Sequence, residues 1–160
     1  MKITPIFHIL SILIMPLSGF MIVSGFVDFA YNNQNWINFF ISATITLFFG
    51  MSVFLATRGH NDQNVDLRQA FILTTMSWIT IAFFGALPFY LSNINLGFTD
   101  SFFESMSGIT TTGSTILISI EASPPGILVW RSLLQWLGGV GVIVMAIAIF
   151  PMLSVGGMQL

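Results

Sequence analysis

Residues 107–115 read S-G-I-T-T-T-G-S-T, a run rich in glycine and hydroxyl-bearing residues inside an otherwise apolar chain. Hydrophobic residues make up 55% of the 160-residue sequence and charged residues 6%, whereas soluble domains carry about 25% charged residues. So few charges cannot cover a water-facing surface, and the composition therefore predicts an integral membrane protein. The formal net charge of −2 provides no basic surface for nucleic acid.

The sequence around this run contains charge-poor segments that are long enough to cross a membrane. A helix needs about 20 apolar residues to span the hydrocarbon. The segments that we expect to be transmembrane helices lie near residues 5–28, 37–57, 70–92 and 127–150. The first segment is longer than a signal-peptide core of about 7–15 residues and no A-x-A site follows it, so we expect a retained helix kinked at Pro16. The predicted fold class is an all-α membrane protein.

The positions of Lys and Arg predict the orientation of these helices, because cytoplasmic loops are enriched in both residue types. Lys2 precedes the first helix, and the loop 58–69 contains Arg58 and Arg68. Residues 93–129 contain neither Lys nor Arg. We therefore expect the N-terminus, the loop and the C-terminal end to lie in the cytoplasm, with the segment before the last helix outside.

A short helix is predicted immediately before the polar run. Residues 100–109 carry apolar side chains at spacings that suit helix packing, and Thr99 or Asp100 can cap the N-terminus. This helix would be only about 15 Å long at 1.5 Å per residue, about half the thickness of a bilayer. A half-helix of this length cannot span, so we expect it to dip into the membrane from outside and return.

The polar residues that follow, 110–115, have the composition of a cation selectivity filter. An alkali cation that leaves water needs its hydration oxygens replaced, and the backbone carbonyls of an extended loop can replace them. Glycine permits the backbone angles that aim successive carbonyls the same way, and β-branched threonine favours extended backbone. A re-entrant loop that only packs against its neighbours could have the same composition. The residues alone leave both interpretations open.

Several charged side chains lie near the predicted outer surface. Arg131 can anchor the last helix by reaching the headgroups, or it can pair with Asp100, Glu104 or Glu121. Glu104 can attract cations at the mouth of a pore, or it can brace the half-helix. Asp28 is interpreted as a plain boundary charge at the end of the first helix.

Three glycines, Gly138, Gly139 and Gly141, lie within the last predicted helix. Small residues allow close approach between membrane helices, and glycines also provide flexibility where an inner helix must bend. Both interpretations are kept, and close approach is the simpler one.

The longest motifs in the chain resemble those of a known family. They are S-G-I-T-T-T-G-S-T-I-L at 107–117, W-R-S-L-L-Q-W-L-G-G-V-G-V-I-V at 130–144 and F-P-M-L-S-V-G-G-M-Q-L at 150–160. Together they resemble the potassium-uptake proteins of the Trk/Ktr/HKT superfamily, and above all the bacterial Trk-type membrane subunits. The resemblance extends over all 160 residues, including two helices ahead of the pore.

The resemblance implies a fold and a site. Family members build one pore from four helix–half-helix–helix repeats within a single chain, and each repeat supplies one filter strand that retains a glycine. Here the glycine is Gly113, and the backbone carbonyls of Thr110, Thr111, Thr112 and Gly113 would face K⁺. Residues 1–69 would form an N-terminal transmembrane helix pair with a cytoplasmic loop.

The second unit, 70–160, would be the first pore repeat. It would consist of helix 70–92, half-helix 100–109, filter 110–115 and helix 127–150. No second T-G-S pattern occurs in the sequence, so we expect an N-terminal piece of a longer transporter.

The expected function is potassium uptake across the bacterial cytoplasmic (inner) membrane, with K⁺ as the transported ion and no cofactor. No nucleophile with a base and no phosphate-binding loop is evident, and His8 and His60 lack metal-ligand spacing, so an enzyme is not expected. His60 is expected to be solvated. By resemblance, the partners are membrane lipid, a second copy of the chain in a homodimer and a cytosolic nucleotide-binding regulatory subunit. Transport of K⁺ alone or by symport with H⁺ or Na⁺ remains open. The alternative function is a structural or assembly membrane protein whose re-entrant loop mediates helix packing.

The predicted orientation can be tested by single-cysteine labelling, because the chain contains no cysteine. We expect a membrane-impermeant maleimide to label Ser123→Cys in intact cells and to label Asn64→Cys only after the cells are opened. Labelling of Asn64→Cys in intact cells would contradict the orientation.

Overall fold

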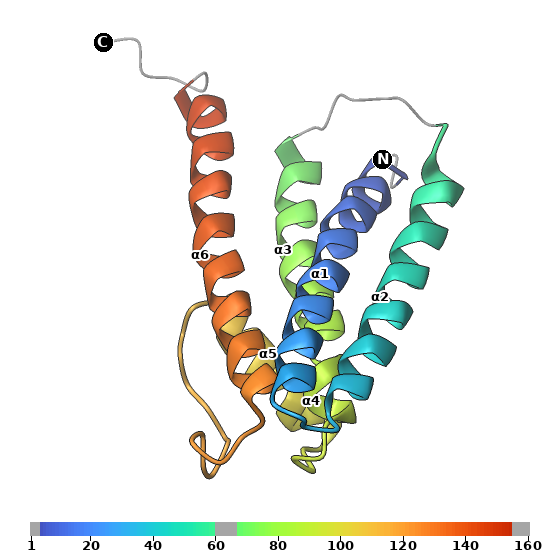
Figure 1. Ribbon diagram of the computed structural model, residues 1–160. Helices are drawn as coiled ribbons and strands as arrows, with labels where there is room; N and C mark the ends of the chain where they lie inside the picture. Colours follow the sequence, from blue (N-terminus) through green and yellow to red (C-terminus); the bar gives the residue numbers. More distant parts are fainter. Residues whose placement is uncertain (1–3, 60–66, 155–160) are drawn as a thin grey trace.

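The computed structural model describes residues 4–59 and 67–154, and Figure 1 labels its helices. They are α1 (Thr4–Ala30), α2 (Trp36–Thr57), α3 (Leu67–Gly85), α4 (Leu87–Leu91), α5 (Phe98–Ile109) and α6 (Pro125–Ser154). No strand occurs in these two ranges, and the all-α fold class is confirmed. His60 and most of the predicted loop 58–69 lie outside the described residues.

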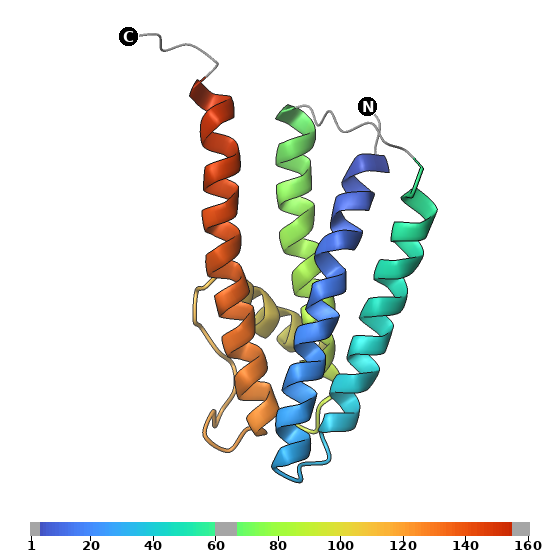
Figure 2. The same cartoon turned by 45° about the horizontal axis from the view of Figure 1, so that its top comes forward.

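Four parts of the described chain are long and apolar enough to cross a membrane. They are Thr4–Ala30, Trp36–Thr57, Arg68–Leu91 and Pro125–Val144, and they correspond to the four segments predicted from the sequence. Figures 1 and 2 show α1, α2, α3 and α6 running along one another, whereas α5 is confined to the lower half of the bundle. The architecture is therefore a bundle of long helices with one short helix inserted at one end.

The pair formed by α1 and α2 packs through small and hydroxyl-bearing residues. A Cβ on Gly25 would lie 3.0 Å from the Cβ of Phe39, so the two helices are already in close contact. Buried hydroxyls bond to carbonyls of their own helix; Thr46 Oγ1, for example, donates to the Ser42 carbonyl at 2.8 Å. Satisfied hydroxyls and small side chains permit the close approach that membrane helices use for packing.

The third predicted helix, 70–92, is interrupted in the structure. α3 ends at Gly85 and α4 begins at Leu87, with Pro88 in its first turn. Proline suits a first turn because it has no N–H to leave unpaired, but it breaks the interior of a helix. The interruption is held by α6, because the Trp130 indole Nε1 donates to the Gly85 carbonyl oxygen at 3.0 Å.

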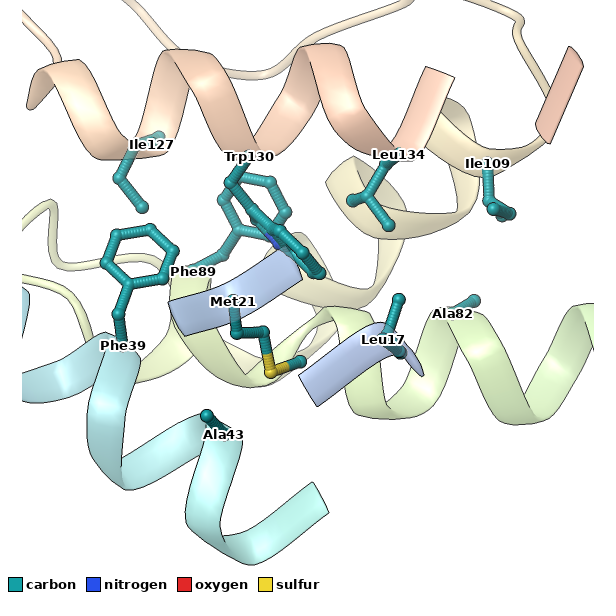
Figure 3. Packing of buried hydrophobic residues seen from close by; sticks show 10 residues of the cluster. All are labelled: Leu17, Met21, Phe39, Ala43, Ala82, Phe89, Ile109, Ile127, Trp130 and Leu134. Carbon is teal, nitrogen blue, oxygen red and sulfur yellow. The ribbon is translucent and has the colours of Figure 1, made fainter. Parts of the chain in front are cut away.

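The hydrophobic core lies where α5 meets the long helices. Figure 3 shows Trp130 of α6 between Phe89 and Leu134, with Met21 of α1 facing it. The buried members of this cluster are Leu17, Met21, Phe39, Ala43, Ala82, Phe89, Ile109, Ile127, Trp130 and Leu134. All six helices contribute to the cluster, so the core of the described chain lies at the end of the bundle that contains α5.

A cavity of about 500 Å³ lies beyond Ile109, between α1, α3 and α6. Its lining is almost entirely apolar and includes Leu17, Trp78 and Gly138. α1, α3 and α6 therefore enclose a cavity beyond the end of α5, whereas α1 and α2 stay in contact there, with His8 Nδ1 2.9 Å from Thr57 Oγ1.

The three glycines of α6 have different surroundings. A Cβ on Gly138 would overlap the backbone carbonyl of Ile109, whereas a Cβ on Gly139 or Gly141 would meet no described atom within 4 Å. Close approach is thus confirmed for Gly138, where α6 touches the C-terminus of α5. The described chain shows no close neighbour that requires the other two glycines.

These surroundings make a matched pair of substitutions informative. We expect Gly138→Ala to destabilise the protein by about 1–3 kcal/mol, because the new methyl group must push α5 away from α6. Gly139→Ala adds the same methyl group in open space and should not lower stability. Thermal unfolding of both variants in detergent measures the difference. Equal stability of the two variants would contradict the close contact.

Candidate ion-binding site

The short helix α5 begins two residues earlier than the sequence predicts. It starts at Phe98, and Gly97 precedes it with extended backbone and no side-chain capping bond. The prediction that Thr99 or Asp100 caps the helix is therefore wrong. Ser101 adds a second donor to the same turn, because its backbone N–H and its Oγ both donate to the Gly97 carbonyl at 2.9 Å. The first turn is closed by backbone rather than by an acidic cap.

The chain reverses direction after α5. With 12 residues, α5 is about 18 Å long and cannot cross a bilayer. Figures 1 and 2 show the chain leaving α5 near the middle of α6, returning beside α6 to the end of the bundle from which α5 came, and then entering α6. We call residues 110–117 the return loop. The geometry has the form of a segment that enters and leaves on one side.

The C-terminus of α5 is closed by a compact turn rather than by extended chain. The Thr112 N–H donates to the Ser107 carbonyl at 3.1 Å, and the Thr111 N–H donates to the Gly108 carbonyl at 3.0 Å. This pair of bonds forms the Schellman motif, in which the first residue after the helix C-cap has left-handed backbone. Thr111 occupies that position with φ of 58°. The expectation of extended backbone throughout 110–115 is therefore wrong at Thr111.

Left-handed backbone is rare for a β-branched residue and costs roughly 1–2 kcal/mol. Glycine is the usual residue at this position of the motif, so the strain at Thr111 needs a cause other than the turn itself. Strained backbone of this kind tends to occur at functional sites. Gly113, two residues later, also has positive φ, at 79°, a conformation that glycine adopts without cost.

The return loop presents a series of unpaired backbone carbonyls. No described residue donates a hydrogen bond to the carbonyl oxygen of Thr110, Thr111, Thr112 or Gly113. All four residues are exposed. Oxygen atoms with free lone pairs on one short segment are the groups that can replace the hydration shell of an alkali cation. The four residues predicted from the sequence thus lie together at the C-terminus of α5.

The next residue, Ser114, is held from α5. Its carbonyl oxygen accepts a hydrogen bond from Ser107 Oγ at 2.6 Å, so one residue of α5 fixes the loop on both sides of Gly113. Ser107 was not among the residues singled out from the sequence. Its place in the S-G-I-T-T-T-G-S motif was the available signal, but the motif does not show which hydroxyl bonds to the loop.

Glu104 braces the end of the return loop. Its side chain is fully buried, and its Oε1 accepts bonds from the Thr115 hydroxyl and from the Ile116 backbone N–H, the latter at 2.9 Å. Its Oε2 accepts from Arg131 Nε at 3.0 Å. Of the two interpretations of Glu104, bracing agrees with the structure. Arg131 pairs with Glu104 rather than extending to headgroups, and its side chain is only 12% exposed.

The interpretation of Asp28 as a plain boundary charge is wrong. The side chain is fully buried, and it accepts hydrogen bonds from Asn35 Nδ2 and from the Gly126 backbone N–H. Sequence position placed Asp28 at a helix end correctly, but nothing local to it indicated a partner 98 residues away.

Comparison with known proteins identifies the family. Residues 35–160 match the family described as TrkH, cation transport protein. The chain belongs to the TrkH family. Together with the four apolar segments, this makes it a multi-pass membrane protein.

Individual relatives agree with the TrkH assignment. The chain is 42% identical over 156 residues to the Trk system potassium uptake protein TrkI of Halomonas elongata, covering 98% of this chain and 32% of the relative. It is 40% identical over 154 residues to the Trk system potassium uptake protein TrkH of Escherichia coli K12, covering 96% of this chain and 32% of the relative. The chain therefore spans about a third of the length of the curated relatives it matches.

A solved structure shows the same fold. The crystal structure of the potassium transporter TrkH from Vibrio parahaemolyticus matches with a TM-score of 0.89 and 34% sequence identity. The match covers 99% of this chain and 34% of the solved chain. The family resemblance inferred from the motifs is confirmed.

The brace behind the return loop yields a prediction. Glu104→Gln keeps the size of the side chain but leaves the buried Arg131 guanidinium without its charged partner, which costs about 3–5 kcal/mol for a buried pair. We expect a lower unfolding temperature and faster hydrogen exchange at Ile116. Glu121→Gln, on an exposed residue, is the matched control and should leave both unchanged. Wild-type exchange at Ile116 in Glu104→Gln would show that the brace does not hold the loop.

Proposed function

We propose that these residues serve potassium uptake across the bacterial cytoplasmic membrane as the first pore repeat of a transporter of the relatives' length. The observation that carries the proposal is the row of free carbonyls on Thr110, Thr111, Thr112 and Gly113 at the end of a half-length helix. The printed names of the relatives, which are potassium uptake proteins, supply the ion.

The chemistry proposed for the site is replacement of water by carbonyl oxygen. A K⁺ ion entering the pore loses part of its hydration shell, and the carbonyls of residues 110–113 provide oxygens in its place. The C-terminus of α5 adds partial negative charge, because its last carbonyls point toward the return loop. K⁺ is cargo, so the proposal involves no cofactor and no enzymatic step.

One strand of this kind cannot surround an ion. The four residues of the proposed site are exposed in this chain, which supports a site that is completed by other strands. In the proposed arrangement, residues 70–160 form one of several similar repeats, and residues 1–69 form a helix pair ahead of them.

Orientation and partners follow the same proposal. We place the N-terminus in the cytoplasm and the return loop toward the outside, because Lys and Arg are absent from 93–129. A homodimer and a cytosolic nucleotide-binding subunit are the proposed protein partners, and membrane lipid surrounds the long helices.

Gly113 provides the experiment that tests the proposal. Its φ of 79° means that a side chain there is strained, although a Cβ would meet no described atom within 4 Å. In the full-length transporter, Gly113→Ser should therefore disturb the carbonyls by about 1–2 kcal/mol of backbone strain without disrupting packing. We expect discrimination of K⁺ over Na⁺ to fall before folding does.

Thr112→Ser is the matched control, because it keeps the hydroxyl and does not require a new backbone conformation. The measurement is ⁸⁶Rb⁺ uptake with competing Na⁺, normalised to the amount of transporter in the membrane. Wild-type discrimination in a well-expressed Gly113→Ser protein would favour a packing role for the loop and a structural or assembly function for the chain.

A further inference from the structure

Asp28 joins the first helix pair to the start of α6. Its Oδ1 accepts a hydrogen bond from the Gly126 backbone N–H at 2.6 Å, and its Oδ2 accepts one from Asn35 Nδ2 at 3.0 Å. Asn35 Oδ1 in turn accepts from Asn38 Nδ2 at 3.0 Å. Asp28 and Asn35 are both fully buried, so this is a satisfied polar network inside the protein and not a surface contact.

The carboxyl group of Asp28 acts as a cap for α6 supplied by another helix. Gly126 lies in the first turn of α6, where backbone N–H groups have no partner within the helix. A carboxyl group at a helix N-terminus satisfies such a donor and interacts favourably with the helix dipole. Most caps come from the residue just before the helix, whereas this one comes from α1.

The approach depends on the absence of a side chain at Gly126. A Cβ there would lie 2.5 Å from Asp28 Cγ and 2.7 Å from the Ser24 carbonyl oxygen. Both atoms belong to α1, and the carbonyl is backbone that cannot rotate away. Asp28 and Gly126 therefore form a matched pair that sets the distance between α1 and the start of α6.

A second buried carboxylate binds α6 one and a half turns later. Arg131 follows Gly126 by five residues, about 7.5 Å along a helix, and it binds Glu104. Glu104 also holds Thr115 and Ile116 of the return loop. The first turns of α6 are thus fixed by α1 on one side and by α5 and the return loop on another.

We infer that Asp28 is a positioning residue for the ion-binding loop, acting through α6. It fixes the first turn of α6, the first turns of α6 place Arg131, and Arg131 with Glu104 places the end of the loop that carries Gly113. The N-terminal helix pair then supports the ion site and is more than a membrane anchor. The statement about the loop's position stands on the structure, whereas its effect on ion discrimination rests on the proposed function.

The test compares variants of the full-length transporter. Asp28→Asn has nearly the same shape but places an amide nitrogen against the amide of Asn35 or against the Gly126 N–H. Gly126→Ala forces α1 away from α6. Gly19→Ala, on the same helix as Asp28 and with no described atom within 4 Å of the new Cβ, is the control. The double variant Asp28→Asn with Asn35→Asp restores donor–acceptor pairing across the same two positions.

Two readouts separate positioning from general stability and from function. The first is hydrogen exchange at residues 113–117 of the purified protein, which we expect to be about three- to ten-fold faster in Asp28→Asn and Gly126→Ala. The second is discrimination of ⁸⁶Rb⁺ from Na⁺ per molecule in the membrane, which we expect to fall about three- to ten-fold, a common size for effects transmitted to a site. The double variant should recover most of the wild-type protection from exchange and most of the wild-type ion discrimination. Gly19→Ala should match wild type in both readouts.

The outcomes are distinguishable. Wild-type exchange at 113–117 in well-folded Asp28→Asn and Gly126→Ala would overturn the inference, as would slower uptake that merely follows a lower protein yield. A third outcome combines faster loop exchange in the variants with a wild-type protein that takes up no ⁸⁶Rb⁺. That outcome would support the positioning role and count against the proposed function.

Discussion

Backbone that leaves a helix among apolar helices must still have its polar groups bonded, and in this chain the buried Glu104 meets that demand at the end of the return loop. Its two oxygens accept bonds from a loop hydroxyl, a loop N–H and the guanidinium of Arg131. Without a buried acceptor at this place, the return loop would have unpaired donors and the arginine an unpaired charge, each costing several kcal/mol. The bonding of residues 115 and 116 is thus concentrated in one side chain. The carbonyls at 110–113 accept no hydrogen bond from a described residue.

α6 contacts each of the elements that hold the return loop or the half-length helix in place. Asp28 caps the first turn of α6, and Arg131 in the second turn binds Glu104 of α5. Trp130 bonds to the Gly85 carbonyl at the end of α3, and Gly138 touches Ile109, the last residue of α5. Three of these contacts lie in the first two turns of α6, whereas Gly138 also borders the cavity. α6 is therefore held by several partners beside the return loop, which is where the proposed ion site would need support.

The sequence predicted the helices well because apolar length alone determines where a chain can cross a membrane. The same reasoning found the half-helix, since about ten residues cannot span. It failed where the answer depends on partners distant in the chain. Asp28 looks like any charge at a helix end until α6 is placed against it. Thr99 looks like a cap in the sequence, but the helix begins at Phe98 and Gly97 precedes it without a side-chain capping bond. The family resemblance proposed residues 110–113 as the site, but it did not predict the turn at Thr111, because threonine's own preference is for extended backbone.

Thr111 also has a consequence for how the protein can change. A threonine held at φ of 58° stores strain that glycine would release, so replacement by glycine is an accessible route to a more stable chain. Selection for thermal stability and selection for ion uptake should therefore diverge at this position. The first would accept glycine, whereas the second would retain a β-branched residue whose stiffness limits the directions of the neighbouring carbonyls. Under the proposed function, a stabilised version of the full-length protein obtained by directed evolution would show a loss of ion discrimination before any loss of expression.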